Sequence, residues 1–184
     1  YLLNGSALCG GRAYSVLEKF FRAYVCEVSG DSGSQAQYQV MNKLAERAYF
    51  NRDIPTVSTK FCGTRENAKL RGSISNISDI NFLPENLVLG TLQGIVEELA
   101  DFYDTMPHSQ VEKIVISGNA VRENRTLQRL IADRFDAEVL ISGIKEEAAL
   151  GCALYAAVVS GTLDLPTVKS FIRYLPVREG NCEK

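Results

Sequence analysis

Apolar residues return at helical spacing in three stretches of the first half of the chain. The stretches are residues 12–26, 35–50 and 85–106, and in each an apolar side chain recurs every three or four positions. This period places the apolar side chains on one face, as in an amphipathic helix packed on a core. We therefore expect three helices. The third should carry its acidic side chains on a solvent-exposed face: Glu97, Glu98, Asp101 and Asp104.

Between the second and third helices the pattern changes to short β-branched runs. Pro55 precedes TVSTKFC, which alternates as a strand does, and SISNIS follows the polar loop GTRENAKLRG. Residues 28–35, VSGDSGSQ, are small and polar and should form a loop. Asp31 in this loop is either a cation ligand or an ordinary solvated aspartate, and the pattern leaves both interpretations open.

Two strand–turn–helix units follow in the second half of the chain. A short apolar strand at 112–117 reaches Gly118, and after a turn the helical period resumes over 124–135. A second strand at 137–142 leads into KEEAALGCALYAAVVSG, which is apolar or small on nearly every side and should be a buried helix. Such units in succession predict α/β architecture with part of the sheet parallel. Since neither a repeat nor a linker interrupts the chain, we expect residues 1–184 to form one domain.

Composition narrows the class of protein. The 184 residues are 46% hydrophobic and 23% charged, with a net charge of −2, which is typical of a globular domain. The near-neutral charge gives no reason to expect nucleic acid or an anionic membrane as a partner, and no apolar run approaches the ~20 residues that span a bilayer. The five cysteines are scattered without CxxC spacing. This spacing argues against a zinc site or a disulfide framework and for a reducing cytoplasm.

The beginning of the chain and its single histidine limit what catalysis can be assigned. The first residues, YLLNGSALCGG, lack an initiator methionine and start inside an apolar run, whereas a natural N-terminus is usually polar. We therefore expect a fragment of a longer protein, with part of any active site outside it. A Ser-His-Asp or Cys-His site would depend on His108 alone, the one histidine present.

The segment KIVISGNAVREN contains the one candidate binding turn. A strand that ends in glycine before a helix can hold a nucleotide, because glycine lets the backbone approach a ligand and the helix N-terminus offers unpaired N–H groups. Neither GxxxxGK[ST] nor GxGxxG occurs in the sequence. From the pattern alone, Gly118 and Asn119 form either a nucleotide-binding turn or an ordinary turn with permissive dihedral angles.

Together these segments resemble the C-terminal domain of the FGGY carbohydrate kinases, and the resemblance covers residues 1 to about 161. It is carried by NGSALCGGRAYSVLEKFF, FCGTRENAKLRGSISNIS, the turn segment above and KEEAALGCALYAAVVSG. The resemblance implies an actin/hexokinase/Hsp70-like (ribonuclease H-like) α/β fold, a mixed sheet flanked by helices. The first two segments are most similar to sedoheptulokinase-type members.

One signature of the family can be followed position by position. The segment from Gly72 to Ile77 fits its first half, except that Asn76 stands where the family has glycine. Eight residues later Asn86 and Leu87 fit its second half, but Gly90 replaces the usual alanine or serine. The sequence therefore fits the signature with two departures.

The resemblance also implies a nucleotide site. Gly5 occupies the glycine that approaches the nucleotide before the first helix, and Cys9 replaces a polar contact found in some members. Gly118 and Asn119 occupy the paired glycines of the adenosine turn; asparagine is tolerable there because it enters left-handed conformations readily. The polar adenosine contact falls on Asn124 or its neighbour Glu123, and Asn124 is also a good N-cap.

The activity implied by the family is transfer of the γ-phosphoryl group of ATP, with Mg²⁺, to a sugar hydroxyl, here most like a ketose such as sedoheptulose. The catalytic aspartate and most of the sugar contacts of the family lie in an N-terminal domain that this chain lacks. We therefore assign no catalytic residue and no metal ligand. The implied partners are ATP, a sugar and that domain, with a homodimer as a further option. Arg65 is either a phosphate or sugar contact or an ordinary loop residue.

Two other readings of the function stay open. The chain could belong to another FGGY kinase that acts on xylulose, gluconate or glycerol. It could also be a non-enzymatic actin-like module that binds a nucleotide or a partner, since this fold serves both roles. A partner-binding module should expose a contiguous apolar patch beyond the interdomain face.

Overall fold

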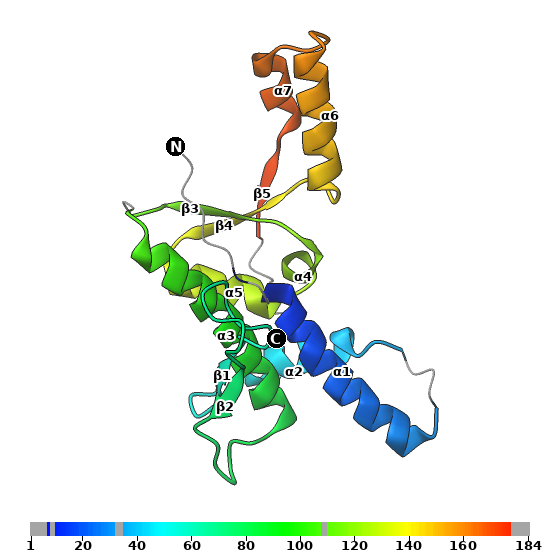
Figure 1. The fold of residues 1–184 in the computed structure, drawn as a ribbon, viewed down its shortest axis with the longest axis vertical. Helices are drawn as coiled ribbons and strands as arrows, with labels where there is room; N and C mark the ends of the chain where they lie inside the picture. Colours follow the sequence, from blue (N-terminus) through cyan, green and yellow to red (C-terminus); the bar gives the residue numbers. More distant parts are fainter. Residues whose placement is uncertain (1–6, 8–9, 32–34, 108–109, 178–184) are drawn as a thin grey trace, which may run out of the picture.

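The computed structural model describes residues 7, 10–31, 35–107 and 110–177. Within these ranges the chain forms helices and short strands (Figure 1). The helices are α1 (Gly10–Ser29), α2 (Tyr38–Ala48), α3 (Pro84–Thr105), α4 (Asn119–Arg122), α5 (Arg125–Phe135), α6 (Glu147–Val159) and α7 (Leu165–Phe171). The strands are β1 (Thr56–Ser58), β2 (Ser73–Ser75), β3 (Lys113–Ile116), β4 (Glu138–Ser142) and β5 (Tyr174–Pro176).

The larger sheet has the order β3-β4-β5. β3 runs parallel to β4, with Ile114 opposite Val139, and β5 runs antiparallel to β4, with Leu175 opposite Ile141. The prediction of an α/β protein with a partly parallel sheet is therefore confirmed, and the sheet is mixed. Neither α7 nor β5 was indicated by the sequence pattern, because both are short and carry a proline.

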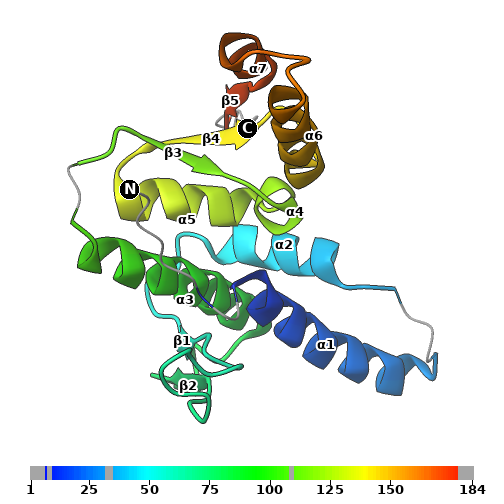
Figure 2. The ribbon, with the colours of Figure 1, turned by 45° about the horizontal axis from the view of Figure 1, so that its top comes forward.

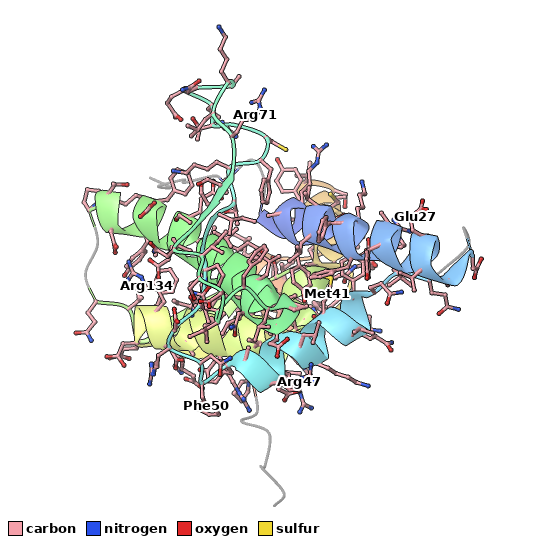
Figure 3. The ribbon with its side chains drawn as sticks, turned by 90° about the horizontal axis from the view of Figure 1, so that it is seen from below. Glu27, Met41, Arg47, Phe50, Arg71 and Arg134 are labelled. Atoms are coloured by element: carbon pink, nitrogen blue, oxygen red, sulfur yellow. The ribbon has the colours of Figure 1, made fainter. Side chains whose placement is uncertain are left out.

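Helices α1, α2, α3 and α5 form a layer on one side of this sheet. In Figure 2, α5 lies between the sheet and α1, α2 and α3. Met41 of α2 and Val88 and Leu92 of α3 are fully buried at the centre of this layer, and Figure 3 shows Met41 between the neighbouring helices. The three amphipathic helices of the first half are confirmed. α3 begins at Pro84, whose fixed φ suits the first helical position, and Leu83 before it is extended.

The two departures from the family signature have local structural reasons. Asn76 has a φ of 56°, a left-handed value that asparagine adopts more readily than most residues with a Cβ. A Cβ added to Gly90 would overlap the carbonyl oxygen of Pro55. Glycine at position 90 thus lets α3 lie directly against the chain that leads into β1. That strand pairs antiparallel with β2 in a separate hairpin and is shorter than the predicted seven-residue run.

The prediction that Glu98 lies on a solvated face is wrong. Glu98 is buried, and its Oε2 accepts a hydrogen bond of 2.9 Å from the hydroxyl of Thr59. The reason is the close crossing of α3 and β1 at Gly94, where an added Cβ would overlap the Val57 carbonyl. Glu97, Asp101 and Asp104 are exposed, as expected.

The prediction that the apolar helix at 145–161 is buried is also wrong. None of the α6 side chains is buried, and Tyr155 and Val159 are 74% and 69% exposed. In Figure 1, α6 and α7 stand apart from the helical layer, beyond the sheet. The sequence pattern predicted the helix and its apolar character correctly. Among the described elements, however, α6 contacts mainly α7, so its apolar side chains stay exposed. None of the described helices has the length and apolar content that crossing a bilayer requires.

Candidate functional site

The candidate site is the turn that follows β3. Gly118 has φ 101° and ψ 152°, a conformation that residues with a Cβ rarely adopt. A Cβ built at this position would meet no atom of the described chain within 4 Å. Glycine is therefore required by the backbone conformation and not by crowding. The space beside the turn is open, and Ser117, Gly118 and Asn119 are all exposed.

Asn119 does not take the left-handed conformation that we expected of it. In the described part of the chain, the residues other than glycine with positive φ are Asn76 and Asp136. Asn119 is instead the first residue of α4. Because Gly118 alone makes the reversal, the position after it is free to be helical.

The beginning of α1 lies beside this turn. A Cβ on Gly11 would be 3.5 Å from the Cβ of Ala120 in α4, and Figure 1 shows α4 next to the first turn of α1. The structure therefore places the first turn of α1 beside the turn at Gly118. Gly5 and Cys9 themselves lie outside the described residues.

A buried polar network holds the turn from the side of the helical layer. Asn124 caps α5, since its Oδ1 accepts the Leu127 N–H at 2.9 Å, which confirms the predicted N-cap. Its amide nitrogen donates to Asn42 Oδ1 at 3.0 Å, and the Tyr14 hydroxyl donates to the same oxygen at 2.8 Å. Asn42 in turn donates to the Glu123 carbonyl at 3.2 Å.

Burial shapes the chemistry of this network. It raises the pKa of the Tyr14 phenol above its usual value, so the hydroxyl stays protonated and remains a donor. Asn124 is 3% exposed, whereas Glu123 beside it is exposed. Asn124 therefore belongs to the buried network beneath the turn, whereas Glu123 lies at the protein surface.

A second set of contacts joins the turn to the loop after β4. The Arg122 guanidinium donates to the carbonyls of Ser142 at 2.9 Å and Ile144 at 2.8 Å. It also forms an ion pair of 2.9 Å with Glu147 at the start of α6. The sequence did not predict this contact. Arg122 and its partners are 20 to 25 residues apart, and no local pattern indicates that residues at such a separation meet. The one available signal was a basic residue in the turn and an acidic pair opening the next helix.

The position of the turn in the sheet suits binding. β3 and β4 are parallel, so the turn after β3 and the loop after β4 lie at the same end of the sheet, the carboxyl end of its strands, where open α/β sheets bind ligands.

The described residues offer little for a metal site or for acid–base catalysis. Within the described ranges, no three or more His, Cys, Asp and Glu side chains are grouped so that they could hold a metal ion. His108 lies outside these ranges. Asp31 is exposed, and its backbone N–H donates to the Ser29 hydroxyl.

A separate cavity lies among the helices, away from the turn. One of about 520 Å³ is bordered by Tyr49, Phe50 and Arg134, between α2, α3 and α5. There burial, helped by a hydrogen bond to Asp133, raises the pKa of Tyr49 to about 12.

Arg65 lies in the exposed loop between β1 and β2. Figure 3 shows Arg71 of the same loop standing away from the helical layer.

Comparisons with known proteins show the family and the fold of the chain. Residues 1–160 match the family described as FGGY family of carbohydrate kinases, C-terminal domain. No curated protein matches the chain. Solved structures resemble it at low sequence identity, and these likenesses confirm the actin-like fold class.

A xylulose kinase from Rhodospirillum rubrum has 19% identity and a TM-score of 0.63 over 91% of this chain and 33% of its own. A gluconate kinase from Lactobacillus acidophilus has 15% identity and a TM-score of 0.64 over 90% and 32%. A glycerol kinase from Plasmodium falciparum, solved with ADP, has 21% identity and a TM-score of 0.60 over 72% and 27%. The chain thus spans about a third of the length of these structures. It belongs to the FGGY family of carbohydrate kinases, of which it carries the C-terminal domain.

Proposed function

We propose that residues 1–184 form, as one domain, the nucleotide-binding half of an ATP-dependent carbohydrate kinase. The observation that carries this proposal is the open turn at Gly118, placed beside the start of α1 in a chain of this family. The adenosine of ATP would lie against Gly118 and Asn119, with Gly5 and the Asn124–Glu123 pair nearby. The ADP in the Plasmodium falciparum glycerol kinase structure supports a nucleotide as the ligand.

This half contributes binding and orientation. The reaction is in-line transfer of the γ-phosphoryl group to a sugar hydroxyl, and ATP with Mg²⁺ supplies the group that is transferred. Such transfer depends mainly on positioning and on electrostatic stabilisation. The general base and the sugar contacts would belong to an N-terminal domain outside residues 1–184. The scattered cysteines favour the reducing cytoplasm as the compartment.

The exposed α6 supports a partner domain. Between Glu147 and Val159 this helix carries no further charged residue, and an apolar helix of this kind is normally covered by protein. We assign the N-terminal domain of the same protein as the main cover, since the matched structures are about three times as long as this chain. A second copy of the chain is the other occupant to test.

The sugar is proposed from a different segment. Residues 61–78 are most similar to sedoheptulokinase-type members, so the full-length enzyme should prefer a seven-carbon ketose. The test compares kcat/KM for sedoheptulose, xylulose, gluconate and glycerol. A preference for one of the last three would remove the sedoheptulose proposal and leave the kinase proposal intact.

One observation also favours a second function. If the N-terminal domain leaves α6 uncovered, the exposed apolar surface of this helix lies beyond the interdomain face and is what a non-enzymatic actin-like module would use to bind a partner. The two functions differ in turnover: a kinase releases ADP in the presence of its sugar, and a binding module does not. A coupled ADP-release assay on the full-length protein, run with the sugar panel, separates them.

A further inference from the structure

Arg122 joins two loops that belong to different strand–helix units. Its backbone is at the end of α4, in the turn after β3, while its guanidinium contacts the end of β4, the following loop and the start of α6. The Arg122 side chain is 16% exposed and that of Glu147 is 26% exposed. Solvent therefore screens this pair less than a fully exposed one.

The geometry suits arginine in particular. A planar guanidinium can donate in several fixed directions, and here it reaches two carbonyl oxygens and one carboxylate at 2.8 to 2.9 Å. The ammonium of lysine is a compact point charge and cannot span the same three acceptors. Hydrogen bonds to ionised groups are also shorter and stronger than neutral ones.

The turn itself is fixed from the opposite side. Gln128 of α5 donates to the carbonyls of Val121 at 2.7 Å and Arg122 at 3.2 Å, and Asn42 holds the carbonyl of Glu123. The backbone of Arg122 is anchored by α5 and α2, so its guanidinium can fix the 143–146 loop. This loop is otherwise tied to the sheet at its first residue, where the Gly143 N–H donates to the Arg173 carbonyl at 2.9 Å.

We propose that Arg122 is a positioning residue for the nucleotide. It holds the 143–146 loop at a fixed distance from the Gly118 turn, so that a nucleoside on the turn meets a second wall that is already in place. This role rests on the nucleotide site proposed above. Arg122 acts without touching the ligand: its guanidinium donates three hydrogen bonds to protein atoms, and its Nε, which has no partner in the described chain, is buried.

A preformed wall lowers the cost of ordering a site when a ligand binds. Loss of the Arg122 contacts should therefore weaken ATP binding and leave the chemical step unchanged. In the full-length kinase, Arg122→Met should raise KM for ATP about tenfold, while kcat at saturating ATP and KM for the sugar stay within about twofold. Arg122→Lys should recover little of the loss.

Two further variants keep the test sharp. Glu147→Gln removes one charge and leaves both carbonyl acceptors, so it should raise KM for ATP in the same direction by a smaller factor. This variant decides the question if Arg122→Met fails to fold. Arg125→Met is the matched control, since Arg125 is an exposed arginine three residues away on α5. It should behave as the wild type.

Amide hydrogen exchange without nucleotide gives an independent readout. Residues 143–146 should exchange faster in Arg122→Met and at the wild-type rate in Arg125→Met. Unchanged exchange in this loop would contradict the positioning role, as would equal losses toward ATP and sugar.

The outcomes separate this inference from the proposed function. If Gly118→Val loses nucleotide binding while Arg122→Met and Glu147→Gln keep the wild-type KM for ATP, the turn is the nucleotide site and only the role of Arg122 is overturned. If the wild type binds no nucleotide, or Gly118→Val binds it as the wild type does, the proposed site itself is wrong.

Discussion

The turn after β3 and the helix α6 after β4 follow neighbouring parallel strands, yet they are supported in opposite ways. The turn is exposed, but Asn124, Asn42 and Gln128 hold its carbonyl groups and its helix end from below. Apolar side chains of α6 such as Tyr155 face solvent, and no α6 side chain is buried.

This difference separates two kinds of surface. A ligand-binding turn must already have its final shape, so its supports have to be in the same chain. An apolar helix gains its stability from burial, which a second surface can provide. The proposed function accordingly makes the first region a prepared ligand site and the second a surface for the N-terminal domain.

The largest expected effect concerns turnover by residues 1–184 alone. If the N-terminal domain supplies the catalytic base, the isolated chain should fold but release no ADP in a sugar-dependent manner. The reason is that half of an interdomain site cannot bring ATP and the sugar hydroxyl into line. A coupled ADP-release assay measures this, with the full-length protein as the control. Sugar-dependent turnover by the purified chain would show that the catalytic base lies within it.

The network below the turn should matter for stability. Asn124→Ala removes the oxygen that caps α5, so the buried Leu127 N–H loses its acceptor, and it removes one of the two hydrogen bonds that Asn42 Oδ1 accepts. We expect a loss of about 2–3 kcal/mol in the free energy of unfolding, measured by denaturant titration. Arg125→Ala, an exposed position on the same helix, should change it by less than about 0.5 kcal/mol. Equal effects of the two variants would mean that the network does not support the turn.

Tyr14→Phe tests one bond of that network and should cost about 1 kcal/mol. The pKa of Tyr14 is raised above its usual 10.0, so the folded state holds the phenolic proton more tightly than the unfolded state. This stabilisation is complete below pH 10 and is lost as the pH rises above it. Stability measured above pH 10 should therefore fall less steeply in Tyr14→Phe than in the wild type. Parallel curves would contradict the buried, protonated phenol.

The smallest effect is expected at α6. In the isolated chain, Tyr155→Ser should change the free energy of unfolding by less than about 0.5 kcal/mol, because the side chain is already 74% exposed. In the full-length protein the same change should be clearly destabilising, since Tyr155 would then be covered. Size-exclusion chromatography of the isolated chain shows whether a second copy covers α6 instead. A Tyr155→Ser effect that is equally small in both proteins would remove α6 from the domain interface.

Local patterns were enough for much of the fold. The period of apolar residues placed α1, α2 and α3, and the strand–turn–helix repetition gave the parallel pair of β3 and β4. The cap at Asn124 also followed from sequence, because a cap is decided within three residues. Features of this kind depend on neighbours in the chain.

The errors arose where distant segments meet. Glu98 was expected in solvent because the helical period of α3 does not show that β1 crosses its polar side at Gly94. The apolar pattern of α6 indicates a need for cover, and the cover is not among the described elements. Arg122 was missed at the site because its partners are 20 to 25 residues away.

The central claim is that the turn at Gly118 binds the nucleoside part of ATP, and calorimetry with Mg·ATP on the full-length protein tests it most directly. A Cβ at this position would stand in the open space beside the turn, and a branched one would resist the φ of 101°. Gly118→Val should weaken ATP binding by roughly a hundredfold or more, or about 3 kcal/mol. Asn119→Gly, the matched change one residue on, should preserve it. Thermal unfolding without ligand confirms that each variant is folded, and a folded Gly118→Val protein with the wild-type ATP affinity would contradict the account.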